Sequence, residues 1–356
     1  MPMGLLWMDR GSEFQALVDA AYEHERAANA AYFARLDQRQ QRHFREDTRY
    51  NVDFLYTALA LDDAHVMQTY AVWLYVLMRG IFKDSPNASD QALHCVLSNL
   101  DCIKLAAHDV VAPEKLPRIL ELVDAGRESV TAYVAHLDGT PPLSCAYEDQ
   151  VSRYLDALFS RNTRAAMALV REFVAGGLSV VTVYVDILAE AMRRVGEMWH
   201  TGAITVDTEH YCTSVTQTAM SQLYPQIFAA PRRGKTILCA CPGAELHEMA
   251  ARMVADLFES DGWDSIYLGA AVPEENLLDA VRENHPDLVA LSVTMPQFLL
   301  ECESAVRALK QEFPQVKVAV GGRAFESTDD VWRKWPIDVY ARDARELLRQ
   351  ANELAG

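Results

Sequence analysis

The sequence predicts an α + α/β protein with three parts: an N-terminal helical domain, a four-helix bundle, and a C-terminal doubly wound parallel sheet of the Rossmann or flavodoxin type. Residues 12–136 and 147–228 carry apolar residues at helical spacing. Residues 235–356 alternate five strand-like runs with helices, which is typical of a parallel sheet covered on both faces. The stretches 137–146 and 228–234 are linkers by composition.

Composition narrows the classes of function. The 356 residues are 50% apolar, so a sizeable core is available, and 33 basic against 50 acidic residues give a net charge of −17. An acidic chain without a long basic run is a poor nucleic-acid binder. The apolar runs are too short to cross a membrane, and the start lacks the pattern of a signal peptide. Seven cysteines without regular spacing indicate a reducing compartment, so we expect a cytoplasmic protein.

The N-terminal domain reads as helical throughout. The segment Met67–Met78 is apolar almost all round, which predicts a central helix. No helix-turn-helix stands out. The expected helices are one from residue 12 past Arg45, then Asp53–Leu61, His65–Ile81, Ala88–His108 and Lys115–His136.

The middle segment predicts a four-helix bundle, because four stretches of helical spacing follow one another with short breaks. These stretches are Tyr147–Phe159, Asn162–Gly176, Val180–Trp199 and Asp207–Ile227.

The C-terminal domain places His247 between a buried strand, Thr236–Ala240, and a helix that includes Ala251–Phe258. His247 therefore lies at the carboxyl edge of the sheet, where open α/β sheets bind their ligands. Glu245, two residues earlier, suits a metal site, since a carboxylate can hold one ring nitrogen while the other ligates. Taken alone, a histidine in this position is more often an ordinary residue at a helix start than a metal ligand.

Two further features follow strand-like runs at set distances. Ser292-Val293-Thr294 closes Leu288–Leu291, and Gly321-Gly322 closes Val316–Val320. With Glu245-Leu246-His247, these features resemble the cobalamin-binding domain of methionine synthase, corrinoid methyltransferase proteins, mutases and light-sensing cobalamin proteins. That family's pattern is Asp-x-His-x-x-Gly, then Ser-x-Leu, then Gly-Gly. Here Glu245 replaces the Asp, Ala250 the Gly and Thr294 the Leu, while Gly269–Pro273 after the second strand also fits.

The resemblance implies roles for these residues. His247 would replace the cofactor's own dimethylbenzimidazole as the lower axial ligand of cobalt. Ser292 would offer a hydroxyl to the slot for the nucleotide tail, and Thr294 another. Gly321 and Gly322 would let the backbone approach closely, although alone they are also read as an ordinary turn. The implied cofactor-binding residues on the sheet are Glu245, Leu246, Ser292, Val293, Thr294, Gly321 and Gly322.

In the bundle, Trp199 is followed after nine residues by Glu209-His210. This arrangement resembles the cap of the adenosylcobalamin-dependent photoreceptors, in which the Trp packs beside the adenosyl group and the Glu and His line the upper pocket. His200 would be an upper cobalt ligand after light removes the adenosyl group. The structural alternative is a core tryptophan followed by a polar helix start.

A helical domain before such a cap resembles the photocobilins, which pair cobalamin with a bilin, usually biliverdin. The alternative is a structural or dimerisation domain whose aromatic residues are core. A bilin needs an elongated apolar slot with aromatic walls and cationic groups for its propionates. Candidate residues are Tyr50, Tyr56, Trp73, Tyr75, Arg42, Arg45, Arg49 and His43.

These features predict a cobalamin-dependent photoreceptor in which light breaks the Co–C bond of adenosylcobalamin and changes domain packing or assembly. The alternatives are a corrinoid methyl carrier and a light-independent cobalamin sensor. No Walker loop, cyclase or kinase signature, or nucleophile triad is found, so we do not expect an enzyme. The signal would then pass through a homo-oligomer or a separate signalling protein. The absence of a DNA-binding domain argues against direct control of DNA.

Overall fold

The computed structural model describes residues 10–137 and 145–355. They divide into two compact units. The first contains the helices up to residue 137 together with residues 327–331, and the second contains the helical bundle and the parallel sheet. Among the described helices, none combines the length and apolar character needed to cross a lipid bilayer.

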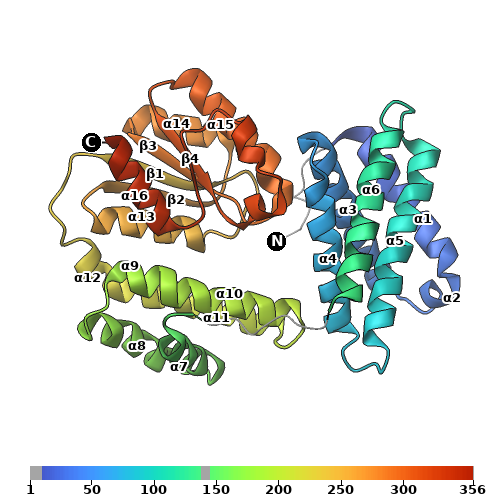
Figure 1. The fold of residues 1–356 in the computed structure, drawn as a ribbon, viewed down its shortest axis with the longest axis horizontal. Coiled ribbons are helices and arrows are strands. Elements are labelled where there is room, and N and C mark those ends of the chain that lie inside the picture. Colours follow the sequence, from blue (N-terminus) through green and yellow to red (C-terminus); the bar gives the residue numbers. More distant parts are fainter. Residues whose placement is uncertain (1–9, 138–144, 356) are drawn as a thin grey trace. The chain divides into compact units, whose positions relative to one another are not determined.

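The described N-terminal part of the first unit consists of helices and their connections (Figure 1). Its elements are α1 Gly11–Ala28, α2 Ala30–Phe33, α3 Gln38–Leu61, α4 Ala64–Ile81, α5 Ala88–Val110 and α6 Leu116–Ala135. The predicted helix from residue 12 past Arg45 is wrong, because α1 ends before Asn29 and α3 begins at Gln38 and runs unbroken to Leu61. The restart is set by Asp37, whose side chain accepts the backbone N–H of Gln40 at 2.8 Å while the Gln40 side chain accepts that of Asp37 at 2.9 Å.

Helix α4 is less enclosed than its composition predicts. Its fully buried residues form one stripe that includes Met67, Tyr70 and Tyr75, while Trp73 and Leu77 are half-buried. The prediction of a central helix nevertheless holds, because α4 packs against α3, α5 and α6.

The bundle has the four predicted helices, and two of them change their winding. They are α7 Glu148–Phe159; α8 Thr163–Ala175; a third made of α9 Val180–Thr182, the π-helical turn η2 Val183–Leu188 and α10 Ala189–His200; and a fourth made of α11 Val206–Met220, the 3₁₀ turn η3 Ser221–Leu223 and α12 Tyr224–Ile227. Their inward faces form one apolar core that includes Tyr154, Phe173, Ile187 and Leu223.

The sheet has five parallel strands in the order β2-β1-β3-β4-β5. Helices α13 and α16 cover one face, and α14 and α15 cover the other (Figure 1). The elements are β1 Thr236–Pro242, α13 Met249–Ser260, β2 Asp264–Val272, α14 Glu274–Asn284, β3 Leu288–Ser292, η4 Pro296–Phe298, α15 Leu299–Glu312, β4 Lys317–Gly321, η5 Arg323–Ser327, η6 Val331–Lys334, β5 Val339–Ala341 and α16 Ala344–Ala355. This is the predicted doubly wound fold, and its strand order places the switch point between β1 and β3.

Strand β2 continues further than expected. Gly269–Val272, predicted to follow the strand, lies inside it, and the pairing with β1 shifts register twice near this end. Gly269 and Ala271 adopt positive φ values of 84° and 53°. The irregular end bonds the loop after β1, because the Ala271 N–H donates to the Glu245 carbonyl at 2.9 Å.

Candidate functional site

The three sequence features meet at one edge of the sheet. Strands β1, β3 and β4 are neighbours, and Ser292 pairs directly with Gly321 at their carboxyl ends. His247 lies in the loop between β1 and α13, beside the switch point where doubly wound sheets bind their ligands. The apolar runs that form the strands thus bring residues about 75 positions apart in sequence to one place.

Glu245 organises this edge. Its side chain is 0% exposed, and one carboxylate oxygen accepts both the His247 backbone N–H at 2.9 Å and the His247 Nδ1 hydrogen bond at 2.6 Å. The other oxygen accepts the backbone N–H groups of Thr294 and Met295, each at 2.8 Å. A single buried carboxylate therefore joins the loop after β1 to the loop after β3.

Glu245 and His247 each stabilise the charged form of the other. Burial raises the pKa of Glu245, but the hydrogen bonds from His247 and from the Met295 N–H outweigh it, so the pKa of Glu245 is lowered. The hydrogen bond to Glu245 raises the pKa of His247 against the opposite effect of burial, and the Glu209 carboxylate raises it further. Glu245 thus stays ionised and fixes the imidazole by its Nδ1, which leaves Nε2 as the nitrogen that could ligate a metal.

In the loop between β1 and α13, the side chains of Leu246 and His247 are exposed. The His247 side chain is 57% exposed, and Leu246 is 52% exposed although it is apolar. An exposed leucine beside an exposed imidazole, both above a buried carboxylate, suits the face of a large apolar ring.

The two glycines allow close backbone contacts. Gly322 has φ +104°, and a Cβ placed there would lie 2.2 Å from the Val293 carbonyl oxygen. A Cβ on Gly321 would lie 2.6 Å from the Ala341 carbonyl oxygen. Val293 is fully buried, and its N–H donates to the Gly321 carbonyl at 3.0 Å. Only glycine fits at position 322, because the ends of β3 and β4 touch there.

Ser292 and Thr294 lie at the end of β3, as predicted. Ser292 is 8% exposed, and Thr294 is half-buried. The sequence prediction assigned Thr294 a hydroxyl role and missed the role of its backbone N–H, which bonds Glu245. Backbone donors leave no trace in residue type, so no sequence signal could have found this contact.

In the bundle, Trp199 and His200 end α10, and a tight turn leads to α11. The Gly202 N–H donates a hydrogen bond to the Trp199 carbonyl at 2.9 Å, which closes this turn. Trp199 and His200 are half-buried. In the first turns of α11, Glu209 bonds His210 at 2.6 Å, and His210 is exposed. The Gln217 side chain of α11 donates to Glu248 at 3.2 Å, so α11 lies beside the loop that carries His247.

Comparison with known proteins decides the class of ligand. A B12-binding domain model matches residues 235–349, and a second B12-binding domain model matches residues 150–224. The chain is a cobalamin-binding protein. The first match covers the sheet with His247, and the second covers most of the helical bundle, which we therefore call the cap.

Individual relatives fall into two groups. The HTH-type transcriptional repressor CarH of Myxococcus xanthus is 31% identical over 169 residues, 47% of this chain and 56% of that protein. The alignment thus spans little more than half of that relative. The dimethylamine corrinoid protein of Methanosarcina barkeri is 25% identical over 213 residues, 58% of this chain and 98% of that protein.

A solved structure shows the same fold. The monomethylamine corrinoid protein of Methanosarcina barkeri has a TM-score of 0.52 at 21% identity, covering 59% of this chain and 100% of that one. The predicted arrangement of a helical cap and a Rossmann-like cobalamin-binding domain is therefore confirmed.

The residues at the sheet edge fit a corrinoid. The imidazole of His247 is oriented by a buried carboxylate, an arrangement that is usual for metal-ligating histidines. The Gln297 side-chain oxygen, three residues past Thr294, is buried and has no hydrogen-bond partner among the described residues. A corrinoid carries amide side chains on its rim, and these can donate to such an acceptor.

Gln297 gives a first prediction. Replacing it with leucine is expected to raise the stability of the cobalamin-free protein by about 1 kcal/mol, because a buried unpaired acceptor is unfavourable. Cobalamin affinity should fall roughly fivefold through loss of one hydrogen bond. Ser265→Ala is the control, since the Ser265 hydroxyl is also buried without a partner but lies at the start of β2. Thermal unfolding and cobalamin titration measure both effects; equal affinity in both variants would contradict a contact between Gln297 and the cofactor.

The N-terminal residues predicted to hold a bilin do not surround one described cavity. Tyr75 is fully buried and bonds Ser89, while Arg49 lies over the ring of Phe14. Tyr56 bonds Glu13 at 3.2 Å. The remaining positions are Tyr50 in an aromatic cluster with Tyr70, Trp73 stacked on Tyr70, Arg45 paired with Asp19, His43 paired with Glu46, and exposed Arg42.

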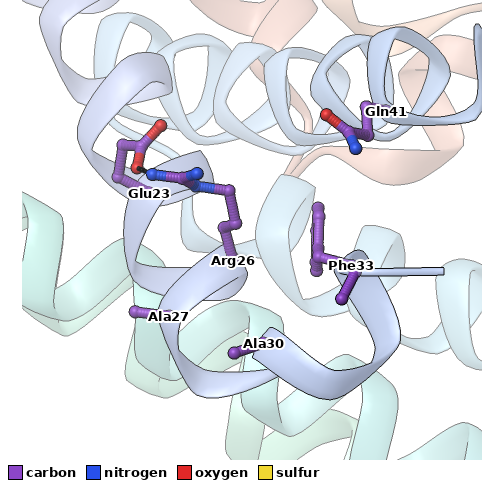
Figure 2. A pocket seen from close by; sticks show the side chains of 7 residues that line it. Glu23, Arg26, Ala27, Ala30, Phe33 and Gln41 are labelled. Carbon is purple, nitrogen blue, oxygen red and sulfur yellow. Dashed lines mark hydrogen bonds and ion pairs between the residues drawn. The ribbon is translucent and has the colours of Figure 1, made fainter. Parts of the chain in front are cut away.

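One cavity of about 410 Å³ in this domain has other walls. Figure 2 shows the paired Glu23 and Arg26 of α1, with Phe33 and Gln41 nearby. A bilin site therefore remains a prediction that rests on the resemblance alone.

Proposed function

We propose that this cobalamin-binding protein is a photoreceptor that holds adenosylcobalamin between the cap and the sheet edge, with His247 as the lower ligand. The observation that carries the proposal is the cap arrangement. Trp199 ends one helix, Glu209 and His210 open the next, and the Gln217 side chain on that second helix donates to Glu248, the residue after His247, at 3.2 Å. The similarity to CarH supports the same reading.

Adenosylcobalamin, when bound, supplies a cobalt–carbon bond that visible light breaks. The chain's own residues hold and report this state. With that cofactor bound, Trp199 would pack against the upper ligand, Glu209 and His210 would line its pocket, and His200, next to Trp199, would be a replacement ligand. A cap that contacts the upper ligand in one state and not in the other has the differential interaction that a switch requires.

A corrinoid methyl carrier is the second candidate. It is favoured by the dimethylamine corrinoid protein, which this chain matches over 98% of that protein's length. In that case the cap would open for partner methyltransferases, and the purified protein would retain a methyl rather than an adenosyl upper ligand. A light-independent cobalamin sensor would bind the same cofactor and show no change of assembly on illumination.

The deciding experiment is absorption spectroscopy of the full chain loaded with adenosylcobalamin and biliverdin in the dark, then after green and after red light. Sedimentation velocity of the same samples reports the oligomeric state. We expect green light to convert the cobalamin bands and to change assembly or shape. A retained red-absorbing band would add a bilin to the proposal. Conversion no faster than that of free cofactor, with unchanged sedimentation, would overturn the photoreceptor.

Trp199→Ala gives a second prediction. Adenosylcobalamin should dissociate in the dark about tenfold faster, because the upper ligand loses an aromatic contact worth about 1.4 kcal/mol. Affinity for hydroxocobalamin, which has no adenosyl group, should change little and serves as the control. Dark retention and photoconversion equal to the parent protein would contradict this role for Trp199.

A further inference from the structure

Helix α13, which starts two residues after His247, carries a polar stripe along the face that meets the cap. Glu248, Arg252 and Asp256 are spaced four residues apart and therefore share one face. Next to them, Met253 and Leu257 pack into the cap's apolar core, with Met249 at its margin. The helix that begins at the cobalt-ligating loop is thus also the floor on which the cap rests.

Each residue of the stripe bonds a different part of the cap. The Gln217 side chain of α11 donates to Glu248 at 3.2 Å. Arg252 donates to the Ser221 hydroxyl and to the Tyr224 hydroxyl, both at 2.9 Å. The Tyr224 ring also lies against the Arg252 guanidinium.

The third contact is the most buried. The Tyr184 hydroxyl donates to Asp256 at 2.9 Å, Tyr184 is 0% exposed and Asp256 is 9% exposed. Burial raises the pKa of Asp256 to about 6, against the opposing effects of Tyr184 and Arg252. Tyr184 belongs to the π-helical turn η2, which interrupts the helix that ends in Trp199 and His200.

The stripe therefore reaches both cap helices that carry upper-pocket residues. Tyr184 lies on the helix of Trp199, and Gln217 lies on α11 two turns after Glu209. Apolar contacts tolerate sliding, whereas hydrogen bonds between specific buried groups fix one register. A π-helical turn lets a helix satisfy a fixed hydrogen-bond register, because its winding departs locally from the regular α-helix.

We propose that the stripe of Glu248, Arg252 and Asp256 is the positioning surface of the cap, fixing the register of the Trp199 and Glu209 helices relative to His247. Asp256 with Tyr184 is its central contact. These residues act on the cofactor through the cap and do not touch it. The inference rests on cobalamin binding and on the cap as upper wall of the site, and it holds for a photoreceptor and a methyl carrier alike.

The test distinguishes a change in the register of the cap helices from a change in the stability of the protein. Asp256→Leu leaves the Tyr184 hydroxyl with only its longer bond to the Met220 carbonyl, at 3.3 Å, and should lower the melting temperature of the cobalamin-free protein by about 5 °C. The double variant Asp256→Leu with Tyr184→Phe removes both polar partners, so most of this loss should be recovered. The cap then keeps its apolar contacts but loses the bond that fixes its register.

The decisive readout is release of adenosylcobalamin from the full chain in the dark, followed with hydrogen exchange of residues 199–217. The double variant should release the cofactor about tenfold faster and exchange faster in this segment, although its melting temperature is restored. The control is Arg345→Met, which breaks the more exposed ion pair with Asp186 at 2.6 Å and should change neither readout.

Parent-like release and exchange in the double variant would overturn the proposal and leave the stripe a structural feature. Should the double variant melt as low as the single one, Tyr184→Phe alone supplies the same comparison, because it removes the bond and leaves Asp256 with Arg252 nearby. All of these measurements are made in the dark, so a failure of light sensing leaves them unaffected.

Discussion

Replacing Gly322 with alanine is expected to destabilise the sheet domain by about 3–5 kcal/mol. Gly322 has φ +104°, a conformation that residues with a Cβ rarely adopt, and the added Cβ would lie 2.2 Å from the Val293 carbonyl oxygen. That oxygen belongs to the backbone between the end of β3 and the Glu245-bonded Thr294, so it cannot move without disturbing the site. Urea unfolding should show a lower midpoint, and cobalamin affinity should fall with it.

A second glycine distinguishes the effect of the Cβ collision at position 322 from the effect of backbone strain. Gly177 has a similar φ of +97°, but a Cβ there would meet nothing within 4 Å. Gly177→Ala should therefore cost only about 1 kcal/mol, the strain of the left-handed conformation. A Gly322→Ala protein as stable as Gly177→Ala would show that the ends of β3 and β4 can separate without loss.

The motif at the sheet edge was predictable because strand ends are predictable. Apolar runs such as Leu288–Leu291 are too short for helices, and parallel strands deliver the residues that follow them to one edge. Ser292 and Gly321 pair across neighbouring strands for this reason. The partnership of Glu245 with His247 also followed from sequence, since two residues of spacing let a carboxylate reach the adjacent ring.

Other features depend on tertiary contacts that residue types do not encode. Glu248, Arg252 and Asp256 read as ordinary polar positions of an amphipathic helix, and only the docked cap reveals their partners. The π-helical turn around Tyr184 is invisible for the same reason, because the apolar spacing passes through it unchanged.

In the N-terminal domain, the fold leaves one sequence prediction untested, the bilin site, and overturns another. Of the aromatic residues grouped by chemistry as bilin candidates, Tyr50 and Trp73 both lie beside Tyr70, whereas Tyr75 is buried and bonds Ser89. The long first helix was predicted because apolar spacing continues through residues 29–37. The capping residue Asp37 there decides where α3 begins, and a single acidic residue is a weak signal against a continuous pattern.

Removing the Glu245 carboxylate should have the largest combined effect on folding and binding. Glu245→Ala leaves the backbone N–H groups of His247, Thr294 and Met295 without their acceptor in a buried place, which is expected to cost about 3–5 kcal/mol. The imidazole also loses the partner that fixes its orientation, so cobalamin affinity should fall roughly 10- to 100-fold.

Two variants make this result specific. Glu245→Asp keeps the charge with one methylene less reach, so it should retain most of the affinity while Glu245→Ala loses it. Glu46→Ala removes the exposed carboxylate that pairs with His43 at 3.1 Å, and it should change stability by no more than about 0.5 kcal/mol. Chemical unfolding of the cobalamin-free protein and titration with hydroxocobalamin measure both quantities. If Glu245→Ala bound hydroxocobalamin as tightly as the parent protein, His247 would not be the residue that ligates cobalt in an orientation set by Glu245.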